Sequence, residues 1–267
     1  MIPLRDTIPT QKTPFLNYGL IAGCVGVWLL QVSLSQAGFI RFLYQYGLVP
    51  GALLDGQVVV DIQVIGGGGL MPSQLRPVLE DAGLPATILP LFTSMFLHGG
   101  WMHLIGNMLF LYIFGDNIED ASGHGRYLLF YLLGGMAGAG AQMAVGPGVL
   151  TPMVGASGAI AGVLGAYMVI YPRSQVVTLI PFMFIMLVRI PAVVFLGLWF
   201  VFEFISGASS LGQVGGGGVA YWAHVGGFVA GTVTGMLYLI YRPRASKKAP
   251  DLLDILGRGR RRRGPWS

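Results

Sequence analysis

The chain has 267 residues, of which 54% are hydrophobic and only 10% charged, against about 25% charged residues in an average soluble domain. This composition excludes an intrinsically disordered chain, which needs low hydrophobicity and high net charge, and it predicts a membrane protein. The formal charge of +5 does not indicate a nucleic-acid partner, because nine of the 16 Lys and Arg residues follow residue 241. A single cysteine, Cys24, excludes an intrachain disulfide and a cysteine-based metal cluster.

Six apolar stretches approach the roughly 20 residues that a membrane-spanning helix requires. In chain order they cover residues 17–36, 92–115, 126–146, 154–171, 190–206 and 219–241. They predict an all-α polytopic membrane protein, a bundle of six transmembrane helices with a long first loop after the first span. The chain then divides into an N-terminal segment, a six-span domain and a basic tail, at residues 1–16, 17–241 and 242–267.

Two stretches need a finer interpretation. Gly99-Gly100 interrupts the second span, so we expect a loop up to this pair and a helix that starts near Trp101. The segment 176–188 is apolar but short, and it contains Pro181. Its length favours an interfacial or re-entrant segment over a seventh span.

The distribution of basic residues predicts the direction of the spans, because short cytoplasmic loops are enriched in Lys and Arg. With six spans, both termini lie on one side of the membrane. That side then holds 14 of the 16 Lys and Arg residues, and the other side holds only Arg41 and Arg76. We therefore expect both termini to be cytoplasmic.

Low-complexity segments lie outside the predicted spans. The runs of four glycines at 66–69 and 215–218 are typical of flexible linkers in outer loops. The tail run RGRRRR favours either contact with anionic lipid, at about 1 kcal/mol per basic residue near the surface, or topology enforcement alone. Membrane lipid is therefore an expected partner, and nucleic acid is not.

Polar side chains inside membrane spans are costly and mark functional sites. His103, Asn107, Ser157 and His224 lie near the outer ends of the second, fourth and sixth spans, which all run from outside to inside. His103 and Asn107 are four residues apart and share a helical face. We therefore expect these side chains to meet at a similar depth from three separate helices.

Small residues predict that the fourth and sixth spans pack closely. Gly158 and Gly162 form a GxxxG pair in the fourth span, and Gly227, Gly231 and Gly235 recur every four residues in the sixth. Such faces let two helices approach to backbone contact. If these faces meet, Ser157 and His224 come within hydrogen-bond distance.

A serine beside a histidine is the minimum for an activated nucleophile, because neutral imidazole takes the hydroxyl proton as the oxygen attacks a carbonyl. The charge that develops on the tetrahedral oxygen then needs hydrogen-bond donors. The Asn107 amide, the His103 ring N–H and the Ser157 backbone N–H are the candidates. The pattern predicts a hydrolase with Ser157 as nucleophile and His224 as general base, without a cofactor.

Three motifs in this chain resemble those of the rhomboid intramembrane serine proteases, in the same order and in the expected spans. They are His103-x-x-x-Asn107, Gly155-Ala156-Ser157-Gly158 and Ala223-His224-x-x-Gly227-x-x-x-Gly231. The resemblance covers residues 90–241, and the first span and its loop by topology. It extends to His98, five residues before His103, and to Glu119, where rhomboids tend to have a structural acid.

The resemblance implies an endopeptidase that cleaves single-span membrane proteins near the outer end of their transmembrane helix. It implies a Ser–His dyad without a third acid, facing a water-filled outer cavity. It also implies a membrane-associated first loop and a mobile fifth span beside which the substrate helix enters. We expect an integral protein of a bacterial cytoplasmic (inner) membrane, and the sequence leaves its oligomeric state open.

Two departures from the family pattern stand out. Some rhomboids have an aromatic residue one turn after the nucleophile, packed under the catalytic histidine, and this chain has Ala161 there. The orientation of His224 must then rest on other groups. The Trp-Arg pair that some members carry in the first loop is not evident.

Other interpretations remain open at this point. The chain could be an inactive rhomboid-like scaffold that binds transmembrane helices, although such proteins usually lack the serine or the histidine. A six-span transporter or channel would favour charged or unwound segments at mid-membrane, and the spans offer only Glu203. That residue could be a third catalytic acid or a gate residue, or it could face outer water or bond a neighbouring helix.

A metal site is not expected. His98, His103 and His124 are the candidate ligands, but His124 lies on the opposite side from the other two. No carboxylate or thiol joins His98 and His103, as a metal site of the usual composition would require.

Overall fold

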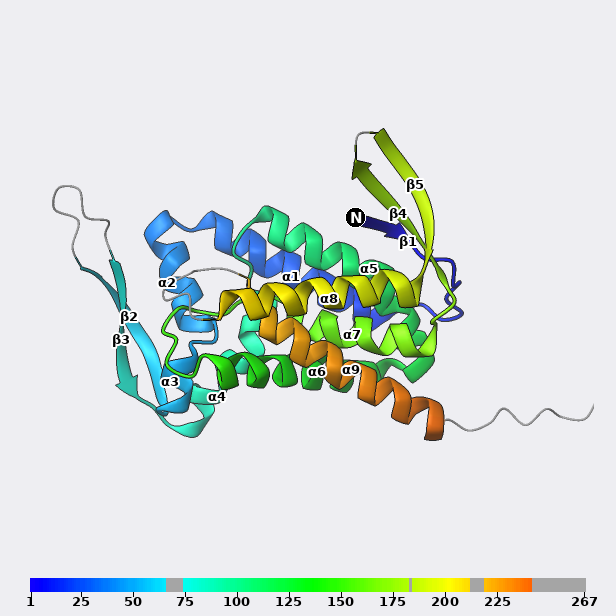
Figure 1. The fold of residues 1–267 in the computed structure, drawn as a ribbon. Helices are drawn as coiled ribbons and strands as arrows, with labels where there is room; N and C mark the ends of the chain where they lie inside the picture. The colour runs from blue at the N-terminus through cyan, green and yellow to red at the C-terminus, as the bar shows by residue number, and fades with distance from the viewer. Residues whose placement is uncertain (66–73, 183, 212–218, 242–267) are drawn as a thin grey trace, which may run out of the picture.

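The computed structural model describes residues 1–65, 74–182, 184–211 and 219–241. The predicted glycine linkers and the basic tail fall in 66–69, 215–218 and 242–267, outside the described residues. Among those described, the long helices are α1 (Phe15–Ser33), α5 (Trp101–Ser122), α6 (His124–Val145), α7 (Ser157–Ile170), α8 (Ala192–Ser210) and α9 (Tyr221–Tyr241). These helices lie side by side as one bundle (Figure 1).

Shorter helices and strands lie at the two ends of the bundle. The connection from α1 to α5 contains α2 (Gln36–Tyr46), α3 (Pro50–Leu54), β2 (Gln57–Ile65), β3 (Gln74–Asp81), α4 (Leu84–Thr93) and a 3-10 turn at Ser94–Phe96. At the opposite end lie β1 (Ile2–Arg5), β4 (Gln175–Phe182) and β5 (Phe184–Pro191) (Figure 1). The bundle thus has a β2–β3 end and a β1–β4–β5 end.

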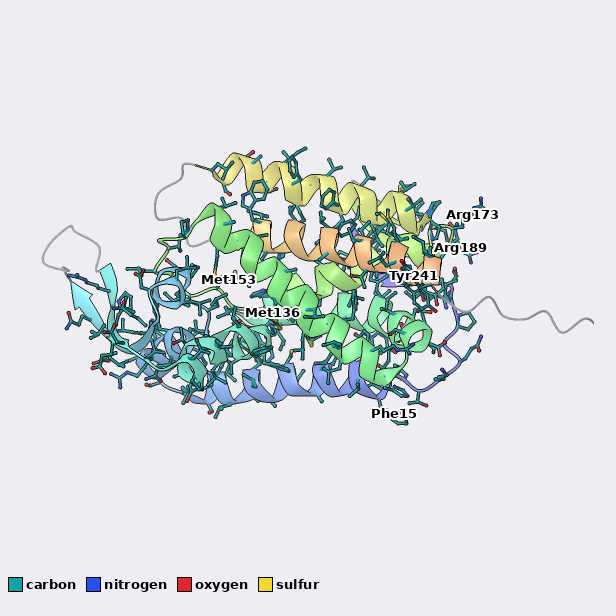
Figure 2. All side chains as sticks on the ribbon, turned by 90° about the horizontal axis from the view of Figure 1, so that it is seen from below. Phe15, Met136, Met153, Arg173, Arg189 and Tyr241 are labelled. Carbon is teal, nitrogen blue, oxygen red and sulfur yellow. The ribbon has the colours of Figure 1, made fainter. Side chains whose placement is uncertain are left out.

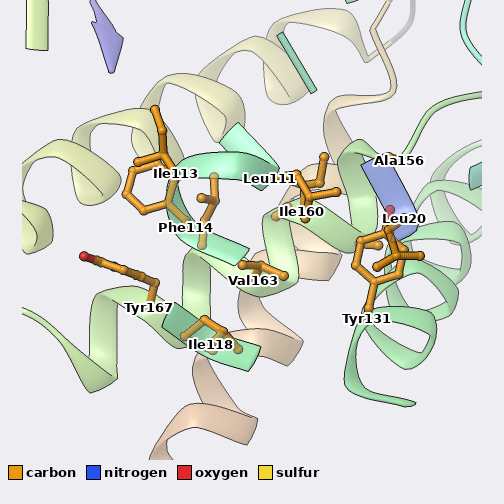
Figure 3. Packing of buried hydrophobic residues seen from close by; sticks show 14 of the residues in the cluster. Leu20, Leu111, Ile113, Phe114, Ile118, Tyr131, Ala156, Ile160, Val163 and Tyr167 are labelled. Atoms are coloured by element: carbon orange, nitrogen blue, oxygen red, sulfur yellow. The ribbon is translucent and has the colours of Figure 1, made fainter. Parts of the chain in front are cut away.

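Helix α7 forms the centre of the bundle. Every residue from Gly158 to Tyr167 is buried, which fits a helix that is apolar on all faces. It packs against α5, α6, α8 and α9. Figure 3 shows Ile160, Val163 and Tyr167 of α7 within the main cluster of buried apolar side chains.

The glycine faces of α7 and α9 meet, as the sequence predicts. A Cβ atom added to Gly227 would lie 2.0 Å from the Gly158 carbonyl oxygen, and one added to Gly231 would lie 1.9 Å from the Gly162 oxygen. Both distances are far below van der Waals contact, so any side chain at these positions must push the two backbones apart. Close packing of membrane helices through small residues follows the same principle.

The break before α5 matches the predicted helix start near Trp101, but the segment before it, expected to be a loop, is helical as far as Phe96. Residues Leu84–Phe96 and α5 are two apolar helical segments bent by 82°, and α5 starts at Trp101. Gln31 of α1 stabilises the break, because its side-chain amide donates to the His98 carbonyl at 3.0 Å and accepts from the His98 N–H at 3.1 Å. The acidic residues Asp116, Glu119 and Asp120 are part of α5, which runs beyond the predicted end of the span to Ser122.

Four of the described helices, α1, α6, α8 and α9, are long and apolar enough to cross a membrane. The bent pair that ends with α5 makes a fifth if it counts as one span. Helix α7 is apolar but has only 14 residues. These findings support a helical membrane bundle, and the count of six spans stays a prediction.

The all-α prediction is wrong at both ends of the bundle. Within the segment 176–188, residues 176–182 belong to β4 and residues 184–188 to β5. These strands pair antiparallel with each other, and β1 pairs with β4 through Ile2 and Leu179. Strands β2 and β3 form a second antiparallel pair in the first loop. Both regions are rich in β-branched residues, which favour strands. The pairing of β1 with β4 joins segments about 170 residues apart, a contact that local sequence patterns do not contain.

Hydrogen bonds connect the start of α1 to the end of α5. The Glu119 carboxylate accepts hydrogen bonds from the backbone N–H groups of Leu16 at 3.0 Å and Asn17 at 2.7 Å, and it also contacts His124. The first N–H groups of a helix have no partner within it, so Glu119 caps α1 from a neighbouring helix. This placement agrees with the structural role that the resemblance implies.

Candidate active site

Ser157 is the first residue of α7, and the turn before it fixes its position. Gly155 has φ +126, a conformation that side chains rarely adopt, and its N–H donates to the Ser94 carbonyl at 2.8 Å. At 14 residues, α7 is about 21 Å long, against about 33 Å for the 22 residues of α6. Helix α7 is therefore about 12 Å shorter than α6.

His224 lies in the first turn of α9, directly opposite Ser157. Its Nε2 atom is 2.8 Å from Ser157 Oγ, and the residue is 8% exposed. The sequence-predicted pair is therefore within hydrogen-bond distance. The close approach of α7 and α9 at Gly227 and Gly231 is what brings the two helix starts together.

Asn107, in the second turn of α5, carries a side-chain nitrogen that is buried without a hydrogen-bond partner among the described residues. A Cβ atom added to Gly155 would lie 3.6 Å from this Nδ2 atom and 2.7 Å from His103 Nε2. Both nitrogens therefore lie over the turn that leads into Ser157. An unpartnered buried donor is costly, and its position beside a candidate nucleophile suits a group that donates a hydrogen bond to an oxygen on which negative charge develops.

The contacts of His103 indicate which of its ring nitrogens carries the proton. Its Nδ1 atom accepts a long hydrogen bond of 3.4 Å from the Gly99 N–H. Neutral imidazole has one N–H, so Nε2 is then the donor, and Nε2 is the atom that lies over Gly155. The ring of the fully buried His98 packs against the edge of His103 at a centroid distance of 5.2 Å.

A cavity of about 720 Å³ opens onto these residues. His103, Asn107, Ser157, Glu203 and His224 contribute to its wall, together with apolar side chains from α5, α7 and α8. This volume lies in the range of about 300–1,000 Å³ that is typical of ligand pockets. Polar groups thus converge on one side of a mostly apolar space, as in a site that binds an apolar chain and reacts with its backbone.

The candidate metal ligands do not converge. His98 and His103 lie together near the cavity, while His124 contacts Glu119 at the start of α6. Within the described ranges, no cluster of three His, Cys, Asp or Glu side chains could hold a metal ion.

Glu203 of α8 is the site residue whose placement the sequence left open. The residue is 9% exposed, and its Oε2 atom lies 2.7 Å from His224 Nδ1. It bonds a neighbouring helix, which is one of the alternatives named above. In the sequence, Glu203 is recognisable as the only acidic residue in the apolar fifth span. Only the tertiary structure shows that its carboxylate contacts His224.

The fold and this site define the class: an integral membrane protein with a Ser–His pair at the end of a helical bundle. Residues 85–241 match the family model of the Rhomboid domain. This is more than half of the chain, and the chain belongs to the rhomboid family. The resemblance stated from the motifs is thereby confirmed.

Several relatives with rhomboid in their names are similar to this chain. Rhomboid protease GluP of Bacillus subtilis is 34% identical over 148 residues, which cover 55% of this chain and 26% of that protein. RHOMBOID-like protein 6, mitochondrial, of Arabidopsis thaliana is 30% identical over 166 residues, which cover 56% of this chain and 43% of that protein. The chain thus spans less than half the length of either relative.

Proposed function

We propose that this protein is an intramembrane serine endopeptidase that cleaves single-span membrane proteins near the outer end of their transmembrane helix. The observation that carries the proposal is the 2.8 Å contact between Ser157 Oγ and His224 Nε2 at the wall of the cavity. Membership of a family with protease-named relatives supports the same chemistry.

The reaction begins when Ser157 Oγ attacks the scissile carbonyl carbon and His224 Nε2 takes the hydroxyl proton. The tetrahedral intermediate collapses, the peptide C–N bond breaks, and His224 gives the proton to the leaving amine. A water molecule from the cavity then attacks the acyl ester with His224 again as base. The carboxylic acid product leaves, and Ser157 regains its proton.

Three donors are suited to the oxyanion of this intermediate. Asn107 Nδ2 is buried and unpartnered among the described residues, and His103 Nε2 lies nearby over Gly155. The Ser157 backbone N–H belongs to the first turn of α7, where N–H groups lack an intrahelical partner. The positive end of the helix dipole also favours negative charge at this position.

We expect Asn107→Ala to lower kcat by about 10²-fold, at the lower end of the 10²–10³ effect of removing one oxyanion donor, because two other donors remain. KM should change little, since the donor acts on charge that develops in the transition state. Steady-state kinetics with a fluorogenic single-span substrate measure both values. A variant with wild-type kcat, or one that only fails to fold, would contradict this role. Asn117→Ala, at the other end of α5, controls for loss of a helical asparagine.

Both termini are proposed to be cytoplasmic, in a bacterial inner membrane. Phe15, Arg173, Arg189 and Tyr241 lie at the same end of the bundle (Figure 2), which supports the separation of basic residues that the positive-inside rule requires. The Ser157 turn faces the opposite, β2–β3 end. With this orientation, the cavity opens toward the outer leaflet.

The proposed substrates follow from the cost of exposing a peptide carbonyl in lipid. A stable transmembrane helix keeps its carbonyls in internal hydrogen bonds, so the peptide must unwind before Ser157 reaches it. We therefore propose substrates whose outer span end contains Gly, Pro or other helix-weakening residues. The family resemblance adds a preference for small residues such as Ala before the cut.

This proposal predicts where in the transmembrane span a substrate is cleaved. Purified protein in liposomes, incubated with a panel of single-span substrates, should give cuts in the outer third of the span, as measured by mass spectrometry. Replacing the helix-weakening residues with Leu should slow cleavage by about tenfold or more, which corresponds to about 1.4 kcal/mol. Cuts at the cytoplasmic end, or rates unaffected by Leu, would refute the substrate model. His224→Ala serves as the inactive control.

A further inference from the structure

Glu203 is a buried acid whose partner is the candidate general base. Along the described lengths of α8 and α9, Glu203 is the only Asp, Glu, Lys or Arg residue. Glu203 Oε2 lies 2.7 Å from His224 Nδ1, and both side chains are about 10% exposed. A buried carboxylate needs a hydrogen-bonded partner, and here that partner is the imidazole that faces Ser157.

The hydrogen-bond chain selects one form of the histidine. An ionised carboxylate only accepts hydrogen bonds, so His224 Nδ1 must carry the N–H that lies between the two groups. In neutral imidazole the other nitrogen, Nε2, then has the free lone pair. That lone pair is directed at Ser157 Oγ, 2.8 Å away, as a general base requires.

The remaining contacts of the His224 ring come from apolar or uncharged groups. The Trp199 ring of α8 lies at a centroid distance of 6.0 Å, with an interplanar angle of 31°. Trp199 in turn packs against Phe228 at 5.8 Å. Ala161, the position that is aromatic in some rhomboids, is too small to support the ring. Helix α8 thus supplies both the acid and the aromatic surface that hold His224.

The other ionisable groups near His224 do not replace Glu203. His103 of α5 lines the same cavity, and its neutral ring presents a donor toward Gly155. Ser157 of α7 lies at the other ring nitrogen of His224, Nε2. Neither can accept the proton on Nδ1 in this arrangement.

We propose that Glu203 is a positioning residue for the proposed protease reaction: it holds His224 in the Nδ1–H tautomer and stabilises the imidazolium that forms when Ser157 attacks. The site is then a Ser157–His224–Glu203 relay rather than a dyad without a third acid. Because Glu203 and Trp199 both belong to α8, the position of this helix controls the orientation of the base. This inference rests on the proposed function, and its mechanism is that of an acid which orients an imidazole without itself being protonated.

The test compares three substitutions of Glu203 with a control on the same helix. We expect Glu203→Gln to lower kcat by about 10²-fold or more, within the range of general-base effects, because an amide can also donate to Nδ1 and so favour the wrong tautomer. Glu203→Ala should lose as much, and Glu203→Asp should recover part of the rate. KM should stay within about threefold, because the effect is on the transition state. Phe202→Leu, at a side chain that is 68% exposed, should keep wild-type kinetics.

A second measurement does not depend on activity. The chain has 4 histidines, so ¹⁵N histidine spectra in detergent can be assigned with single substitutions. His224 should be in the Nδ1–H form in the wild type and should shift toward the Nε2–H form in Glu203→Gln. An Nε2–H form in the wild type, or a spectrum that Glu203→Gln leaves unchanged, would overturn the inference.

The two proposals can fail separately. Wild-type cleavage that Ser157→Ala abolishes but Glu203→Gln and Glu203→Ala leave unchanged would refute the role of Glu203 and leave the protease intact. Absence of any serine-dependent cleavage or acylation in the wild type would refute the protease. The ¹⁵N spectra would still decide whether Glu203 sets the tautomer of His224.

Discussion

We expect Ser157→Ala to abolish proteolysis, with a fall in kcat of at least about 10³-fold; loss of the nucleophile costs more than this in a well-studied serine protease. The same substitution should abolish covalent labelling by a fluorophosphonate. Both results follow because Ser157 carries the only side-chain hydroxyl among the described residues that line the cavity. Gel-based labelling and cleavage of a single-span substrate, measured in parallel on purified protein, provide the two readouts.

Ser157 is distinguished from other serines by the partner of its hydroxyl. Ser33, Ser122 and Ser210 each donate to a backbone carbonyl of their own helix, the usual arrangement for a helical serine. The Ser157 hydroxyl instead faces the ring nitrogen of His224. Ser122→Ala is therefore a matched control, and it should keep full activity and labelling. Labelling that survives Ser157→Ala would exclude this residue as the nucleophile.

The second large effect is expected at the contact between α7 and α9. Gly231→Ala places a methyl group 1.9 Å from the Gly162 carbonyl oxygen, and neither backbone can move without disturbing the helix that carries Ser157 or the one that carries His224. We expect a loss of stability at or above the upper end of the roughly 1–3 kcal/mol that overpacking costs. Activity should fall further, because separation of the helices lengthens the Ser157–His224 contact.

Thermal unfolding in detergent measures the stability change, and cleavage of the same substrate measures the activity. Gly140→Ala is the matched control, since a Cβ atom added to this residue of α6 meets nothing within 4 Å. It should be neutral or stabilising, by up to about 1 kcal/mol from helix propensity. If Gly231→Ala and Gly140→Ala behave alike, close backbone contact is not what aligns the two helices.

Much of the helical core and the identity of the candidate site can be inferred from the sequence, because both depend on patterns that are local or repeat along one helix. Apolar stretches of about 20 residues indicate spans through the cost of exposing backbone polar groups in lipid. Polar residues within such stretches are few, so His103, Asn107, Ser157 and His224 are conspicuous. The glycine repeats of α7 and α9 predict close packing, and the structure places Gly227 and Gly231 against the opposing backbone.

Tertiary structure alone decided the features that join distant segments. The strand pairing of Ile2 with Leu179 depends on a partner far along the chain, so the apolar segment 176–188 could not be recognised as part of a sheet. The orientation of His224 depends on which face of α8 turns toward α9. The sequence could not predict this rotation, because α8 is only weakly amphipathic and has no single apolar stripe that would face the bundle. The contact of Glu203 with His224 Nδ1 is a consequence of that rotation.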